Sequence, residues 1–385
     1  MITGIEHRML TDESPWHFAA TFLTVNDASS RHLACLGGNG KMEAKMNASK
    51  SPVIQTQVVG SYPVPGWLQA LPSAPNLRDA MLTIIKTQEL AGLDILSDGE
   101  LSRFDPNHPE TNGMIEYFIR PLDGITQSIG LSEREAYQQA QGMQFRSRPP
   151  GMVIGPIGEG SLDLKSSWES MKPLAQGNLM FTLTSPYMLA KTLHDKHYGN
   201  LRDLTMGLAS VLADQVSYVD ASMVQIDEAN LPGHPEDADW FHEPLNLILE
   251  RIRGERALHL CFGNYGGQQI QTGHWKNLVT SLNRLKVDHL VLECSRLESS
   301  QLESLKDIRQ DIALGIGVID IKSNLVESAD VVAMRIEEAA RKLGPERVQW
   351  VHPDCGFWML PRSVADRKMK QLVAGRDLYE GRSVR

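Results

Sequence analysis

The sequence predicts an α/β fold, a (β/α)8 TIM barrel with an insertion between strands 2 and 3. Eight short apolar runs typical of buried strands occur between residues 53 and 356, and most are separated by segments long enough for a crossover helix. Polar or sulfur-containing side chains follow several of these runs, as expected where parallel strands end at one rim of a barrel. A chain of 385 residues is long enough for this fold, which usually takes about 250.

The eight expected strands are residues 53–63, 93–100, 179–186, 223–229, 257–264, 289–295, 312–322 and 348–356. Helical spacing of apolar residues is found in the intervening segments LRDAMLTIIKTQELAGL, LTMGLASVLADQVSYV and VVAMRIEEAARKLG. The insertion, residues 101–178, contains a ninth candidate strand at 152–158 and is expected to supply an extra hairpin. A doubly wound open sheet is the alternative, although eight units would be many for one.

The chain divides into an expected N-terminal extension, residues 1–50, and an expected catalytic barrel, residues 51–385. The segment GGNGKMEAKMNASKS near the end of the extension is polar, contains glycine and lacks an apolar period, which is typical of a linker. We therefore expect the extension to take no part in the chemistry.

Charge and cysteine content narrow the classes of function. The chain has 47 acidic and 38 basic residues, a net charge of −9, and no long basic run, which argues against nucleic acid or an anionic membrane as a partner. Four cysteines are too few for a secreted disulfide scaffold and favour the reducing cytoplasm. No apolar stretch is long enough to span a bilayer, and the pattern of a signal peptide is missing.

A candidate zinc site lies where three of the expected strands end: His259 and Cys261 in HLCFGN, Glu293 in LVLECSR and Cys355 in VHPDCG. Two thiolates, an imidazole and a carboxylate suit a tetrahedral zinc ion. Singly, each residue has an ordinary interpretation, such as a core histidine, a buried ion pair or an apolar cysteine. Their shared position at the strand ends favours the metal. Cys294 alternates with Glu293 and is expected to be structural.

Three further polar residues end expected strands and could bind a small zwitterion. The Ser61 hydroxyl and nearby backbone N–H groups could donate hydrogen bonds to a carboxylate. Glu100 and Asp227 could bind an ammonium group. The alternative for each is helix capping, which commonly uses these residue types. Asp98 and Glu228 are direct neighbours that could act in their place.

The chain resembles the C-terminal catalytic barrel of cobalamin-independent methionine synthase. The resemblance covers about residues 53–380 and is carried, in order, by VVGSYP, GLDILSDGE, LTSPY, QIDEA, HLCFGN, LECSR, GIGVIDIKS and WVHPDCG. It implies that zinc is bound by His259, Cys261, Glu293 and Cys355. It also implies that homocysteine is bound by Ser61, Glu100 and Asp227.

The resemblance further implies a zinc-dependent methyltransferase that converts homocysteine to methionine. The expected donor is a methyl-corrinoid or methyl-tetrahydrofolate, free or on a partner protein. Asp227 and Lys322 are the catalytic candidates, with Asp320 as an alternative to Lys322 for handling a proton. This chain departs from the family in three ways: it has room for one barrel instead of two, Lys322 replaces a usual histidine, and Thr192 stands where an aromatic residue contacts the pterin.

Two other functions remain open at this point. The first is a zinc-thiolate alkyltransferase that acts on a different thiol resembling coenzyme M. Ser61, Glu100 and Asp227 argue against it, because a group of residues that binds an amino acid would have no use for a sulfonate thiol. The second is a non-catalytic protein that binds zinc or a thiol.

Overall fold

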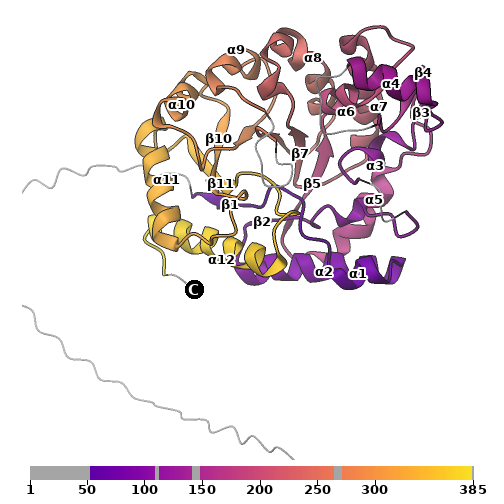
Figure 1. The fold of residues 1–385 in the computed structure, drawn as a ribbon. Coiled ribbons are helices and arrows are strands. Elements are labelled where there is room, and N and C mark those ends of the chain that lie inside the picture. Colours follow the sequence, from indigo (N-terminus) through magenta and orange to yellow (C-terminus); the bar gives the residue numbers. More distant parts are fainter. Residues whose placement is uncertain (1–52, 109–111, 141–147, 264–270, 384–385) are drawn as a thin grey trace, which may run out of the picture. The chain divides into compact units, whose positions relative to one another are not determined.

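The structure is a computed structural model, and it describes residues 53–108, 112–140, 148–263 and 271–383. The barrel strands are β1 (Gln55–Thr56), β2 (Ile95–Leu96), β5 (Asn178–Thr184), β7 (Met223–Glu228), β8 (Glu255–Leu260), β9 (His289–Leu292), β10 (Ala313–Ile319) and β11 (Val348–Pro353). Their order is β1-β11-β10-β9-β8-β7-β5-β2, and neighbouring strands are parallel. A parallel bridge between Gln57 and Ile95 joins the two ends of this order, so the sheet closes. The predicted barrel is confirmed (Figure 1).

Helices surround the barrel. They are α1 (Gly66–Ala70), α2 (Ala74–Ala91), α3 (Glu116–Ile119), α4 (Leu131–Ala140), α5 (Leu164–Met171), α6 (Pro186–Thr192), α7 (Leu201–Val216), α8 (Ala238–Leu249), α9 (Val279–Leu282), α10 (Ser299–Glu303), α11 (Ala329–Leu343) and α12 (Arg362–Tyr379). Short 3-10 helices cover Leu101–Arg103, Lys172–Leu174, Leu231–Gly233, Pro235–Asp237, Trp275–Asn277 and Ser304–Asp307. The three segments with helical spacing correspond to α2, α7 and α11. Residues at both ends of α2 set its limits: the Ser73 side chain caps the first turn, and Gly92, at φ 85°, ends the helix.

The barrel strands end earlier than the sequence predicted. Residues 53–63 and 93–100 contain only the short strands β1 and β2, and the remaining residues build loops at the rim. Gly99 and Glu100 have φ values of 73° and 61°, which no strand accommodates. The apolar pattern continued past the strands because rim residues such as Val58 and Val59 are buried too. Burial, and not strand pairing, sets that pattern.

The insertion between the second and third barrel strands supplies two strands to a small sheet at the periphery, and a third strand comes from after the third barrel strand (Figure 1). In it, β3 (Asp123–Thr126) pairs antiparallel with β4 (Met152–Gly158), and β4 pairs in parallel with β6 (His194–Asp195). The expected strand at 152–158 and the expected hairpin are therefore present. The predicted extension, residues 1–50, lies outside the described residues.

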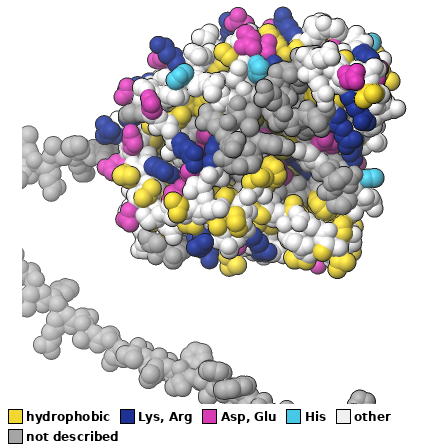
Figure 2. Space-filling view, in the orientation of Figure 1, with side chains coloured by type: hydrophobic (Ala, Val, Ile, Leu, Met, Phe, Trp, Pro, Cys, Tyr) yellow, Lys and Arg dark blue, Asp and Glu magenta, His cyan; other side chains and the backbone are white. Residues whose placement is uncertain are grey.

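The surface carries charges of both signs. On the face in Figure 2, basic and acidic side chains are interspersed around the edge, and hydrophobic side chains gather in the lower part. Trp67 and Leu71, in and directly after α1, are among the exposed apolar residues, at 40% and 69%. Within the described ranges, none of the helices combines the length and the apolar character that a membrane span requires.

Candidate metal and homocysteine site

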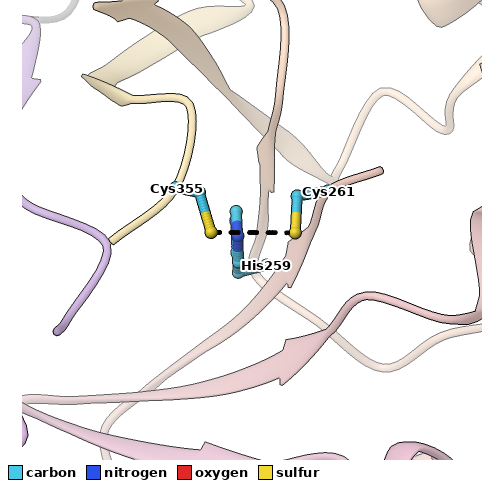
Figure 3. A group of neighbouring side chains, drawn as sticks. All are labelled: His259, Cys261 and Cys355. Carbon is cyan, nitrogen blue, oxygen red and sulfur yellow. Dashed lines mark hydrogen bonds between the residues drawn. The ribbon is translucent and has the colours of Figure 1, made fainter. Parts of the chain in front are cut away.

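Three of the four predicted zinc ligands converge at one end of the barrel. His259 is in β8, Cys261 directly follows β8, and Cys355 follows β11. Their ligating atoms all lie within 4.8 Å of one another, and the two Sγ atoms are 3.8 Å apart. Figure 3 shows the three side chains pointing toward a common centre. One imidazole and two thiols could hold a metal ion, and some catalytic zinc sites use the same three donors.

The His259 ring is oriented for metal binding. Its Nδ1 lies 3.0 Å from the carbonyl oxygen of Val291 in the neighbouring strand β9. A neutral ring that donates from Nδ1 presents the Nε2 lone pair to a metal ion. Nε2 is buried and has no hydrogen bond of normal geometry within the described part of the chain. A buried nitrogen in this position fits a ligand to zinc.

Electrostatics at the cluster favour a cation. The hydrogen bond to Cys261 and the neighbouring His259 ring hold the pKa of the Cys355 thiol well below its usual range, against the opposing effect of burial. Burial opposes charge on His259, but Cys355 and Asp227 outweigh it and raise the pKa of the ring to about 9. The hydrogen bond to Cys355 and burial raise the pKa of Cys261. One thiol thus ionises readily, and a bound dication would favour the thiolate of both.

Glu293 is held beside the cluster by two other groups. One carboxylate oxygen, Oε2, accepts a hydrogen bond from the backbone N–H of Phe262 at 2.9 Å, directly after Cys261. The other, Oε1, lies 2.5 Å from Nζ of Lys322, and the two side chains are only 5% and 2% exposed. Burial opposes charge on Lys322, but Glu293 outweighs it and raises the pKa of the ammonium group. Glu293 as a zinc ligand remains a prediction.

Ser61 is brought next to Cys355 by a close contact between two rim loops. The backbone N–H of Phe357 donates to the carbonyl oxygen of Ser61 at 2.7 Å. A Cβ at Gly356 would collide with the Ser61 hydroxyl as it is placed here, so this position between Cys355 and Phe357 favours glycine. The glycine of the motif DCG therefore allows the loop after β1 to approach the loop after β11.

Glu100 occupies a strained backbone position that aims its carboxylate at Gly60. A Cβ at Gly60 would collide with Oε1 of Glu100. The Thr182 hydroxyl donates to Oε1 at 3.4 Å, and Nη1 of Arg103 lies 3.5 Å from Oε2. Burial raises the pKa of Glu100 although Arg103 opposes the shift. Positive φ at a residue other than glycine costs about 1–3 kcal/mol and is typical of functional sites.

Asp227 lies beside His259, because these two residues are register partners in the adjacent strands β7 and β8. The Gln225 side chain donates to Oδ1 of Asp227 at 2.7 Å. Oδ2 is buried and has no hydrogen-bond partner among the described residues. Burial and the nearby Glu100 raise the pKa of Asp227 to about 7. A carboxylate pair of this kind is stabilised by a cationic group placed between its members.

One cavity of about 860 Å³ connects the two parts of the site. The predicted residues that line it are Ser61, Glu100, Asp227, His259, Cys261 and Cys355. Apolar side chains also line it, among them Met114, Met188 and Trp358, and so does Thr192. Glu293 and Lys322 are not among the described residues that form its wall.

The residues that hold the predicted ones in place could not be found by motif. Arg103 and Gln225 support Glu100 and Asp227, and Asp354 accepts hydrogen bonds from the backbone N–H groups of Cys294 and Ser295 at 3.0 and 2.9 Å. In the sequence, only their closeness to predicted residues could have indicated a supporting role: Arg103 follows Glu100 by three positions, and Asp354 precedes Cys355.

The alternatives to the predicted residues have local roles. Asp98 accepts the backbone N–H groups of Glu100 and Ser102, at 2.9 and 2.7 Å. Glu228 accepts those of Asn230 and Leu231, at 2.6 and 3.1 Å, although it also lines the cavity. Both therefore cap turns at the rim.

Asp320, the alternative to Lys322 for handling a proton, is held by two other groups. Asp320 accepts the backbone N–H of Lys322 at 2.8 Å and forms an ion pair with Arg296 at 2.7 Å. Its carboxylate is thus committed to the loop that carries Lys322.

Comparisons with known proteins identify the family of the chain. Residues 68–376 match the family described as "Cobalamin-independent synthase, Catalytic domain". A methionine synthase from Saccharolobus islandicus is 28% identical over 343 residues, which cover 85% of this chain and 95% of the relative.

Solved structures share the fold. A B12-independent methionine synthase from Shewanella sp., in complex with selenomethionine, has a TM-score of 0.69 at 21% identity and covers 86% of this chain and 98% of its own. A putative enzyme of the same kind from Listeria monocytogenes has a TM-score of 0.60 at 19% identity, with coverages of 86% and 99%. The family match extends over most of the barrel, so the chain belongs to the cobalamin-independent synthase family and contains its catalytic domain.

Proposed function

We propose that this member of the family is a zinc-dependent methyltransferase that transfers a methyl group to the thiol of homocysteine and forms methionine. The observation that carries the proposal is the shared cavity, which is lined by the His259, Cys261 and Cys355 cluster and by the Ser61, Glu100 and Asp227 group. The reaction needs a metal site that activates the sulfur of the substrate and polar groups that bind the rest of the amino acid. This cavity has residues for both. Glu293 is the proposed additional zinc ligand.

The proposed roles divide between binding and orientation. Glu100 and Asp227 receive the ammonium group of homocysteine, and Ser61 receives its carboxylate. Zinc, when bound, would supply the positive charge that deprotonates the substrate thiol, whose pKa is otherwise about 8.5. Holding the amino acid at both charged ends limits the directions from which its sulfur can approach a methyl group, which favours reaction.

The proposed methyl donor is a methyl-corrinoid or methyl-tetrahydrofolate, free or delivered by a partner protein. A cavity of about 860 Å³ is in the range for a drug-sized ligand and so leaves room beside an amino acid for a second reactant. Asp227 is the proposed catalytic residue that contacts substrate. Lys322 does not line the cavity in the described residues, so we propose that it acts through Glu293.

Methionine formation, measured by mass spectrometry, tests the proposal. Zinc-loaded protein is incubated with homocysteine and either methyl-tetrahydrofolate or methylcobalamin, with a phosphine reductant to reproduce the reducing cytoplasm in which we place it. We expect methionine with at least one donor, and none without protein. Product from a thiol lacking an amino group, but not from homocysteine, would instead favour the alkyltransferase of another thiol. Tight homocysteine binding without product from any donor would favour a non-catalytic binding protein.

We also propose that residues 51–385 form the catalytic unit and that residues 1–50 are dispensable. The first described strand is tied to α12, because the backbone N–H of Ile54 donates to Glu380 at 2.7 Å and Arg376 donates to the carbonyl oxygen of Ile54 at 2.6 Å. Removal of residues 1–45 is therefore expected to leave the unfolding midpoint and methionine formation unchanged. A shortened protein that precipitates or loses activity would show that the extension belongs to the folded unit.

A further inference from the structure

The ion pair between Lys322 and Glu293 is buried next to the metal cluster. Lys322 follows β10 and Glu293 follows β9, and both side chains are at most 5% exposed. Both oxygens of the carboxylate are engaged, one by the Lys322 ammonium group and one by the backbone N–H of Phe262. Because Phe262 directly follows Cys261, this second contact keeps the carboxylate beside a metal-binding cysteine.

An ammonium group and a zinc ion attract the same carboxylate and repel each other. In a buried site this competition is strong, because charges interact more strongly there than in water. A buried carboxylate without any partner is also costly. Lys322 therefore offers Glu293 a charged partner other than the metal ion, which an uncharged residue at this position could not offer.

We propose that Lys322 is a positioning residue that competes with zinc for Glu293 and thereby lowers the affinity of the site for zinc when no substrate is bound. The inference rests on the zinc site of the proposed function. It agrees with charge balance: a dication, two thiolates and a neutral imidazole sum to zero, and Glu293 and Lys322 cancel each other.

Zinc affinity without substrate tests the proposal. The affinity is measured by competition with a chromophoric chelator for the parent protein and for Lys322→Met. We expect the variant to bind zinc about 10-fold more tightly, a change on the scale of contacts to metal ligands. In a Glu293→Gln background, where the contested carboxylate is gone, the same lysine change is expected to have no effect. Lys322→Gln, which keeps polarity without charge, replaces the methionine variant if that variant does not fold.

A matched control uses another buried lysine of this chain. Lys342 is buried, with its side chain 5% exposed, and lies 3.2 Å from Glu338 within α11, away from the loop that carries Lys322. Lys342→Met should leave zinc affinity unchanged. Weaker zinc binding in Lys322→Met would overturn the proposal, because it would mean that the lysine supports Glu293 as a ligand. An undiminished effect in the Glu293→Gln background would overturn it as well. No methyl donor is involved, so a failure to form methionine leaves this test valid.

Discussion

Replacing Asp227 with asparagine is expected to lower kcat/KM for homocysteine by about 100-fold. Truncating one partner of a buried charge pair typically costs 2–5 kcal/mol or more, and 100-fold corresponds to about 2.7 kcal/mol. The asparagine side chain would keep an oxygen for the Gln225 amide, which donates to Asp227 at 2.7 Å, so the fold should be retained. The charge that faces the substrate ammonium group would be lost. Initial rates of methionine formation at several homocysteine concentrations measure the effect.

The same change tests which thiol is the substrate. A thiol without an amino group makes no use of Asp227, so its methylation should be unaffected by Asp227→Asn. Equal losses for both thiols would contradict the proposed ammonium contact. A control is Glu228→Gln, because the neighbouring Glu228 caps a turn through the N–H groups of Asn230 and Leu231 and glutamine keeps an accepting oxygen. Its effect on the KM for homocysteine should be small.

The pH dependence supplies a second readout for Asp227. Burial and Glu100 raise its pKa to about 7, so the carboxyl group is protonated below that pH and ionised above it. An ammonium group binds the ionised form. The KM for homocysteine should therefore fall as the pH rises through about 7, and this dependence should be weaker in Asp227→Asn, where Glu100 is the remaining carboxyl group.

The barrel could be predicted because its strands and its helices each have a recognisable pattern of apolar residues in the sequence. Buried parallel strands appear as continuous apolar runs, and crossover helices such as α2, α7 and α11 have apolar residues at helical spacing. The rim could not be predicted at the level of single residues. The turn at Gly99 and Glu100 depends on positive φ values, and buried loop residues resemble strand residues in hydropathy.

The site was predictable where its chemistry requires particular residue types. His259, Cys261 and Cys355 are such residues, and the structure brings their ligating atoms together. Contacts between residues that are far apart in the sequence cannot be recognised from residue types. Thr182 lies 82 residues from Glu100, and Lys322 lies 29 residues from Glu293, so only the closed barrel shows that they meet. The engagement of Glu293 by Lys322 was therefore beyond the reach of motif analysis.

Replacing Cys355 with serine is expected to lower zinc affinity by at least about 100-fold, the upper end of what even contacts to ligands contribute. Cys355 has the more acidic of the two paired thiols, since its pKa is held well below the usual range by the hydrogen bond to Cys261 and by His259. A serine hydroxyl stays protonated near neutral pH and is a poor ligand for zinc, so the cluster would lose one of its two anionic donors. Zinc content after dialysis, measured by mass spectrometry, should fall well below that of the parent protein.

The control for this change is the same substitution at a cysteine outside the cluster. Cys294 is packed against the core next to Glu293, and it does not belong to the group of converging ligands. Cys294→Ser introduces the same hydroxyl and the same loss of a partly buried sulfur, so it should reduce stability without reducing zinc content. Cys355 converges with His259 and Cys261 (Figure 3), so unequal metal content of the two variants would attribute the loss to coordination. Equal zinc content in Cys355→Ser and the parent protein would contradict the assignment of Cys355 as a ligand, and with it the zinc chemistry on which the proposed methyl transfer depends.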